Sequence, residues 1–283
     1  MAAENVLIDA RALAALAPDE VLVVDCRFAL ADPGQGKRAF LDAHVPHAVY
    51  ASLDQDLSDL SKRGLGRHPL PDVDAFARTL ARWGWHRGQR IVAYDAAGGA
   101  LAAARLWWML GSVGIAASVL DGGWQAWSAS GLPVEAGATL PTPSAITDLR
   151  FDSCRVVYVD TFDRLRRQPA TLVLDARAAA RFRGESEPID RAAGHVPGAR
   201  NRPFSQNLAP DDHFKPASVL RQEFTALLGP HAAADVVHMC GSGVTACHNL
   251  LAMEAAGLPD SRLFAPSWSG WVSDPSRPVA TGD

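Results

Sequence analysis

The sequence predicts an α/β protein made of two tandem, similar domains, each a mostly parallel sheet flanked by helices on both faces. Short apolar runs alternate with helical patterns along the 283 residues. The runs show no polar alternation, which is typical of parallel strands covered on both faces. In addition, motifs of the first half recur in the second half in the same order. A duplicated α/β unit accounts for all three observations.

The internal repeat consists of four matched motifs at a nearly constant offset. Val-Leu-Val-Val-Asp-Cys-Arg at 21–27 resembles Thr-Leu-Val-Leu-Asp-Ala-Arg at 171–177, and Ala-His-Val-Pro at 43–46 resembles Gly-His-Val-Pro at 194–197. The other two matched pairs of segments are 90–95 with 235–240 and 120–124 with 264–268. A solenoid would need shorter and more numerous periods, so the repeat indicates two domains.

The elements follow from these runs. In the first half we expect strands at 21–25, 48–50, 90–94 and 117–120, and helices at 71–83 and 99–110. In the second half we expect strands at 171–175, 199–201, 236–239 and 262–264, and helices at 216–228 and 243–256. Pro and Thr residues with little periodicity mark a linker at 137–153. The expected domains are therefore 1–136 and 154–283.

Composition excludes several classes of function. Lysine and arginine total 27 against 31 aspartates and glutamates, a net charge of −4, which argues against nucleic-acid binding and a polybasic membrane surface. No apolar run is long enough to span a membrane. The first residues carry no signal-peptide pattern, and the four cysteines are too scattered for a disulfide framework. We therefore expect a cytoplasmic protein with reduced thiols.

The segment around Cys240 carries most of the chemical information. A buried strand is expected to end at Met239, and a helix to begin near Gly243, with Gly241 and Gly243 in the tight loop between them. This places the Cys240 sulfur at the carboxyl edge of a sheet and before a helix N-terminus, where backbone N–H groups and the helix dipole favour an anion. Such a loop can hold a thiolate, or a sulfur atom carried on it.

Here the sequence resembles the two-domain rhodanese-type sulfurtransferases. Cys240-Gly-Ser-Gly-Val-Thr-Ala looks like their active-site loop, and its neutral Gly-Ser pair looks like the 3-mercaptopyruvate branch of the family; the thiosulfate branch usually carries cations just after the cysteine. The resemblance spans nearly the whole chain and includes both His-Val-Pro turns and Ser-Trp-Ser-Gly-Trp at 267–271. In the first half, Asp95 stands at the position of Cys240, and a carboxylate cannot carry sulfane sulfur. The first domain is therefore expected to be catalytically silent.

The resemblance also implies the roles of individual residues. Arg181 matches a substrate arginine of the family and Arg191 a second one in a displaced register, whereas we read Arg177 as a structural ion pair. Ser242, with His68 and Asp54 from the first domain, matches a proton relay, which suits chemistry that must protonate a released enolate. Arg67 is a further possible cation of the cleft. The loop residues expected to bind the transferred sulfur and its donor are Gly241, Gly243, Val244 and Thr245.

The expected reaction is a double displacement through a Cys240 persulfide, from 3-mercaptopyruvate to cyanide, a thiol or a dithiol protein reductant, with no metal and no cofactor. Thiosulfate is the alternative donor. His238, Cys240, Cys247 and His248 match no zinc spacing. A cysteine-dependent phosphatase would need an arginine at position 246, which is alanine. A non-catalytic binding protein is the remaining alternative.

Overall fold

The computed structural model describes residues 6–283 and divides the chain into two compact units. The first unit runs to Asp59 and also holds Leu70–Phe151 and Pro210–Phe214. The second holds Leu60–Pro69, Asp152–Ala209 and Lys215–Asp283. Two short segments thus belong to the opposite unit from the one that their position in the sequence suggests.

The first unit contains a five-stranded parallel sheet in the order β1-β5-β4-β2-β3. Its strands are β1 (Leu7–Ile8), β2 (Val21–Asp25), β3 (Val49–Tyr50), β4 (Arg90–Tyr94) and β5 (Ala117–Leu120). Its helices are α1 (Ala10–Ala14), α2 (Gln35–Asp42), α3 (Val73–Arg82), α4 (Ala103–Ser112) and α5 (Gly123–Ala129).

The second unit repeats this topology, with the strand order β6-β10-β9-β7-β8, all parallel. Its strands are β6 (Val156–Val157), β7 (Leu172–Asp175), β8 (Arg200–Asn201), β9 (Val236–Met239) and β10 (Arg262–Phe264). Its helices are α6 (Val159–Leu165), α7 (Ala179–Phe182), α8 (Ala217–Leu228), α9 (Ala246–Ala255) and α10 (Ser267–Trp271), with 3₁₀ turns η1 (Phe204–Asn207) and η2 (Ala233–Asp235).

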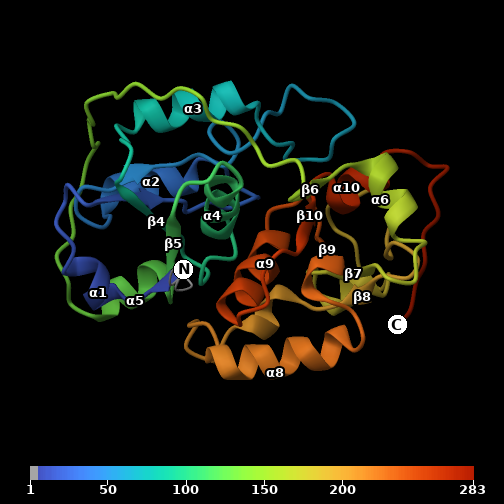
Figure 1. Ribbon diagram of the computed structural model, residues 1–283. Coiled ribbons are helices and arrows are strands. Elements are labelled where there is room, and N and C mark those ends of the chain that lie inside the picture. The colour runs from blue at the N-terminus through green and yellow to red at the C-terminus, as the bar shows by residue number, and fades with distance from the viewer. Residues whose placement is uncertain (1–5) are drawn as a thin grey trace. The chain divides into compact units, whose positions relative to one another are not determined.

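Both faces of each sheet are buried. In the second unit, Val237 and Met239 of β9 pack in one apolar cluster with Phe162 of α6 and Trp268 of α10. The intervening His238 faces the other way, toward α9, and contacts Met253 there. Figure 1 shows α8 and α9 together on one side of this sheet, and α6 and α10 on the other. The predicted α/β class with helices on both faces is confirmed.

The two helices that follow the Asp95 and Cys240 loops begin later than the sequence pattern suggests. We expected one from residue 99, but α4 begins at Ala103, because the backbone N–H groups just before it point to the Asp95 carboxylate. We expected another from residue 243, but α9 begins at Ala246, because Gly243 has a φ of 77° and its N–H points to Cys240. In both places backbone N–H groups of the loop donate to the side chain at its first residue before the helix starts.

No helix among residues 6–283 is long and apolar enough to cross a membrane.

Candidate active site

The Cys240 loop begins directly after the central strand of the second sheet. Cys240 follows the last residue of β9 and is 1% exposed. The Gly243 N–H donates to Cys240 Sγ over 3.2 Å, so the loop folds back on the sulfur. That turn needs the left-handed backbone of Gly243, which a residue with a Cβ adopts at a cost. Val244 and Thr245 complete the loop, and Thr245 is the N-cap residue of α9.

The segment 267–271, whose sequence carries no obvious chemistry, holds this loop in place. Ser267 Oγ accepts the Cys240 N–H at 3.1 Å and donates to the Phe264 carbonyl. The Trp268 and Ser269 N–H groups donate to the carbonyls of Cys240 and Gly241, each over 2.9 Å. Ser267 has a φ of 51°, which is strained for a residue other than glycine, and such strain is common beside functional groups. These contacts join residues far apart in sequence, so no local pattern could reveal them.

A histidine and a serine form a direct pair beside the cysteine. His68 Nδ1 lies 2.8 Å from Ser242 Oγ, and both side chains are buried. His68 belongs to Leu60–Pro69, which is part of the second unit, although its position in the sequence places it in the first half. The Arg67 N–H anchors this segment by donating to Ser269 Oγ over 2.9 Å.

Two guanidinium groups lie over the Gly241 backbone. A Cβ at Gly241 would lie 3.2 Å from Nη2 of Arg67 and 3.6 Å from Nη1 of Arg181. Glycine at this position therefore lets two cations approach the residue that follows Cys240. The loop has no cation of its own, yet cations from two other segments reach it. The sequence offered Arg67 only as a possible cleft cation, and nothing in its pattern indicates this pairing with Arg181.

Two carboxylates neutralise these arginines. Glu187 accepts from Arg181 at 2.7 Å, and Asp190 accepts from Arg67 at 2.7 Å and from Arg181 at 3.2 Å. Burial tends to raise the pKa of Glu187, but hydrogen bonds from Arg181 and from the Asp190 and Ile189 N–H groups hold it below its ordinary value. The side chains of Glu187 and Asp190 are 3% and 5% exposed.

The remaining arginines of this segment lie elsewhere. Arg177 donates to Asp175 at 2.7 Å and to the Gly194 carbonyl at 2.7 Å, so its reading as a structural ion pair is confirmed. Arg191 is exposed and influences Asp274 electrostatically. The structure thus brings Arg67, rather than Arg191, together with Arg181 at Gly241.

The equivalent loop of the first unit encloses its own carboxylate. Asp95 follows β4, whose register with β2 matches that of β9 with β7, so its equivalence to Cys240 is confirmed. Its oxygens accept N–H groups of five residues: Ala97, Gly99, Leu101, Ala102 and Ala103. The side chain therefore fills the anion-binding centre of this loop, and Asp95 is fully buried.

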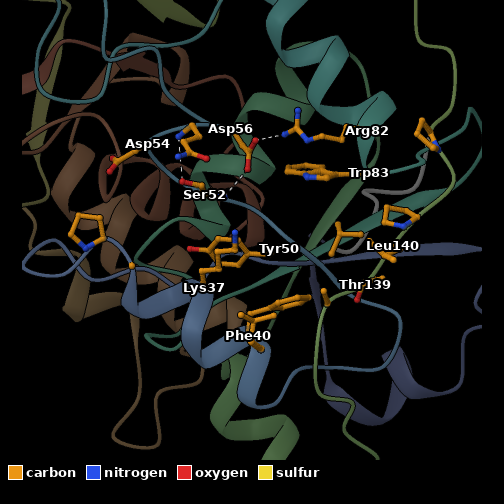
Figure 2. A pocket seen from close by; sticks show the side chains of 18 residues that line it. Lys37, Phe40, Tyr50, Ser52, Asp54, Asp56, Arg82, Trp83, Thr139 and Leu140 are labelled. Carbon is orange, nitrogen blue, oxygen red and sulfur yellow. Dashed lines mark hydrogen bonds and ion pairs between the residues drawn. The ribbon is translucent and has the colours of Figure 1, made fainter.

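Asp54 lies in the first unit, beside a cavity of about 820 Å³. Figure 2 shows Asp54 at one side of this cavity, while Asp56 lies between Ser52 and Arg82. The Ser52 N–H and the Arg82 guanidinium both donate to Asp56. Burial raises the pKa of Asp54 above its ordinary value.

Within the described residues, no group of three or more histidine, cysteine, aspartate or glutamate side chains is arranged to hold a metal ion. Cys26, Cys154, Cys240 and Cys247 are all free thiols.

Comparison with known proteins agrees with this geometry. The description of the rhodanese-like domain matches residues 7–130 and again 159–274. The chain belongs to the rhodanese-like family. A Pseudomonas aeruginosa protein named as a 3-mercaptopyruvate sulfurtransferase is 46% identical over 281 residues, which cover 98% of each chain. A Mycobacterium tuberculosis protein named as a thiosulfate sulfurtransferase, SseB, is 40% identical over 98% of each chain.

Solved rhodanese-like structures give the same result. The 3-mercaptopyruvate sulfurtransferase from Leishmania major superposes with a TM-score of 0.83 at 32% identity, over 96% of this chain and 76% of that one. The Escherichia coli enzyme SseA superposes with a TM-score of 0.78 at 30% identity, over 94% of this chain and all of that one. The predicted fold of two rhodanese-like domains and the predicted sulfurtransferase class are confirmed.

Proposed function

We propose that this rhodanese-like protein transfers sulfane sulfur from 3-mercaptopyruvate to a thiophilic acceptor through a persulfide on Cys240. The observation that carries the proposal is the arrangement beside Cys240, where the Gly243 N–H reaches the sulfur and the His68–Ser242 pair adjoins the same loop. The names of the relatives from Pseudomonas aeruginosa, Leishmania major and Escherichia coli support this donor.

In the first half-reaction the Cys240 thiolate attacks the sulfur of 3-mercaptopyruvate. A sulfur–sulfur bond forms and the carbon–sulfur bond breaks, and its electron pair leaves on carbon as the enolate of pyruvate. The enolate takes up one proton and becomes pyruvate, so no external oxidant or reductant takes part. Arg181 and Arg67 bind the donor carboxylate, for which their forked N–H groups are well suited.

The proton for the enolate comes through Ser242 and His68. Their separation of 2.8 Å allows the hydroxyl to pass a proton to carbon while the imidazole replaces it. As the resemblance to the family implies, we propose Asp54 as the third member of this proton relay. A positioned proton donor of this kind is typically worth about 10²- to 10⁴-fold in rate.

In the second half-reaction the acceptor attacks the outer sulfur and regenerates the Cys240 thiolate. The persulfide anion is held by backbone N–H groups of residues 241–246, of which Gly243 already lies 3.2 Å from the inner sulfur position. The proposed acceptors are cyanide, thiols and a dithiol protein reductant, and the proposed compartment is the cytoplasm. We propose no metal or cofactor for this chemistry.

Thiosulfate is the second candidate donor, because two guanidinium groups lie beside Gly241 and suit an oxyanion as well as a carboxylate. The Mycobacterium tuberculosis relative carries a thiosulfate name. Cleavage of thiosulfate releases sulfite and needs no protonation of carbon. The two donors therefore place different demands on Ser242.

The test is a comparison of kcat/KM for 3-mercaptopyruvate and thiosulfate with cyanide as the acceptor, followed as thiocyanate. We expect the higher value with 3-mercaptopyruvate, and we expect Ser242→Ala to lower kcat about 10²-fold with this donor but hardly at all with thiosulfate. A higher kcat/KM for thiosulfate in the unaltered protein would refute the 3-mercaptopyruvate assignment. No thiocyanate from either donor would leave the binding-protein alternative.

A further inference from the structure

We propose that Asp190 is a specificity-determining residue that occupies the anion site between Arg67 and Arg181 and makes the free site select singly charged donors. This inference rests on the proposed function, because it concerns how that donor enters. The geometry that carries it is a single carboxylate that accepts from both arginines, Arg67 at 2.7 Å and Arg181 at 3.2 Å.

The placement of Asp190 mimics that of a bound donor. Its side chain is only 5% exposed, and both of its partners lie over Gly241, the residue after the nucleophile. A donor carboxylate that approaches Cys240 seeks the same guanidinium donors. The carboxylate of the incoming sulfur donor must therefore displace the Asp190 oxygens or share the guanidinium N–H groups with them.

Arg67 has one N–H group that is not used by Asp190 and could bind an incoming oxygen. Its Nε atom is buried and has no hydrogen-bond partner, whereas its Nη1 donates to Asp190. Arg181 differs, since its Nε and Nη2 are both engaged by Glu187. A buried unused N–H is unfavourable, so an incoming oxygen that satisfies it gains affinity.

The charges around Gly241 explain the selection. The cations Arg67 and Arg181 are matched by the carboxylates of Glu187 and Asp190. Arg177, which also contacts Glu187, is matched by Asp175, so the free site has no net charge. A dianion such as thiosulfate would face two carboxylates at close range, and this repulsion grows with its charge. Neutralising Asp190 leaves one net positive charge beside Cys240 and favours the dianion most.

The experiment compares alkylation of Cys240 by iodoacetate, an anion, and iodoacetamide, its neutral analogue. The rates are read from the Cys240 peptide by mass spectrometry. We expect Asp190→Asn to raise the iodoacetate-to-iodoacetamide ratio about three- to tenfold, from the gain of one net positive charge near the sulfur. Glu185→Gln is the matched control, because Glu185 is an exposed carboxylate of the same segment that pairs with Arg183 instead.

A positioning role for Asp190 would give the opposite result. If this carboxylate only holds the two arginines in place, Asp190→Asn lowers the ratio or leaves it unchanged, and the proposal is overturned. Asp190→Ser, which also removes the charge but has a smaller side chain, must act in the same direction as Asp190→Asn. Thermal melting of both variants confirms that each is folded.

Turnover gives the second readout. We expect Asp190→Asn to raise kcat/KM for thiosulfate relative to 3-mercaptopyruvate about tenfold, while Glu185→Gln leaves the ratio of the two unchanged. An unchanged ratio in Asp190→Asn would overturn the selection. If the unaltered protein uses neither donor, the proposed function fails while the alkylation ratio still tests the role of Asp190.

Discussion

At the scale of the residue, Asp95 and Cys240 occupy equivalent positions after β4 and β9, and the surrounding loops differ accordingly. The Asp95 carboxylate takes up N–H groups from five residues of its own loop. The Cys240 sulfur receives that of Gly243. A loop whose centre is filled by its own carboxylate has no room for a transferred sulfur atom. This difference supports our proposal that Cys240 alone carries the reaction.

Mutation of Cys240 in the loop and of Cys247 in α9 should have clearly different effects on activity. We expect Cys240→Ser to abolish release of thiocyanate, and Cys247→Ser to retain most of it. Cys247 is buried in α9 and donates to the Gly243 carbonyl over 3.4 Å, a bond that a serine hydroxyl can replace. A comparable loss in both variants would mean that Cys247 takes part in the chemistry.

Removal of the Arg181 guanidinium should mainly weaken the binding of the sulfur donor. Arg181→Ala removes one charged hydrogen-bond partner of the donor carboxylate. The loss should be about 1.5–3 kcal/mol, which lowers kcat/KM roughly 10- to 100-fold. The rate at which cyanide discharges a preformed persulfide should change little. Arg183→Ala is the control, because Arg183 is an arginine of the same segment that pairs with Glu185. Unchanged kcat/KM values for both donors would place Arg181 outside the site.

At the scale of the element, β9 carries a histidine that opposes folding in acid. His238 is fully buried, contacts Met253 through Nε2, and has no hydrogen-bond partner at Nδ1. Burial lowers its pKa to about 3, so the folded protein keeps the imidazole neutral. The unfolded chain binds a proton near the ordinary histidine pKa of about 6.5. Stability is therefore lost as pH falls below about 6.5 and continues to fall toward pH 3.

Replacement of this histidine should remove that pH dependence. Between pH 7 and pH 5 the neutral His238 costs about 2 kcal/mol of unfolding free energy, which His238→Leu should recover. The measurement is urea denaturation of both proteins at the two pH values. The control is His231→Gln, because His231 lies at the surface and contacts a backbone carbonyl. Its unfolding free energy should change between the two pH values as much as that of the unaltered protein. If the unfolding free energies of His238→Leu and the unaltered protein change equally with pH, His238 does not cause the loss of stability in acid.

The elements that could be predicted from the sequence are those with several patterned residues. The strands β2, β4, β5, β9 and β10 agree with the apolar runs that predicted them. The edge strands β1 and β6 have no counterpart among the predicted strands, and both are short segments defined by pairing with a distant strand. Helix starts were displaced because the competing partner, a carboxylate or a sulfur, lies in the loop itself.

Some features of the candidate site could be predicted from local sequence, and others could not. The position of Cys240 and the structural role of Arg177 follow from local sequence, because a strand, a tight loop and a helix are adjacent in the chain. The pairing of Arg67 with Asp190 joins residues far apart in sequence, and the contact of Ser267 with Cys240 depends on how β10 lies beside β9. Such contacts arise from the topology of the sheet and leave no local pattern.

At the scale of the whole molecule, duplication has preserved one buried ion pair in each unit. Arg27 donates to Asp25 at 2.6 Å and lies over the ring of Trp124. In the second unit Arg177 repeats these contacts with Asp175 and Trp268. Each arginine also donates to a backbone carbonyl that precedes the histidine of a His-Val-Pro turn. The pair therefore ties the end of a central strand to a turn in both units.

The second copy has one connection that the first lacks. Arg177 Nη1 lies 3.3 Å from Glu187, which binds Arg181 at 2.7 Å, so the structural pair leads to the arginine that we propose binds the donor. In the first unit Asp25 instead receives the Tyr94 hydroxyl at 2.6 Å. The same substitution should therefore destabilise both units, but it should lower activity only in the second.

Arg27→Met and Arg177→Met test this difference with the protein as its own control. Each leaves a buried aspartate without its cation, which should lower the unfolding free energy by about 3–5 kcal/mol, less for Arg27 because the Tyr94 hydroxyl remains. Thermal melting and denaturant titration measure this loss. With activity measured well below both transitions and scaled to folded protein, we expect Arg177→Met to lower kcat/KM about tenfold, because Glu187 loses one of its two cations and holds Arg181 differently. Arg27→Met should leave kcat/KM nearly unchanged, and equal activity losses in the two variants would show that Glu187 carries no such coupling.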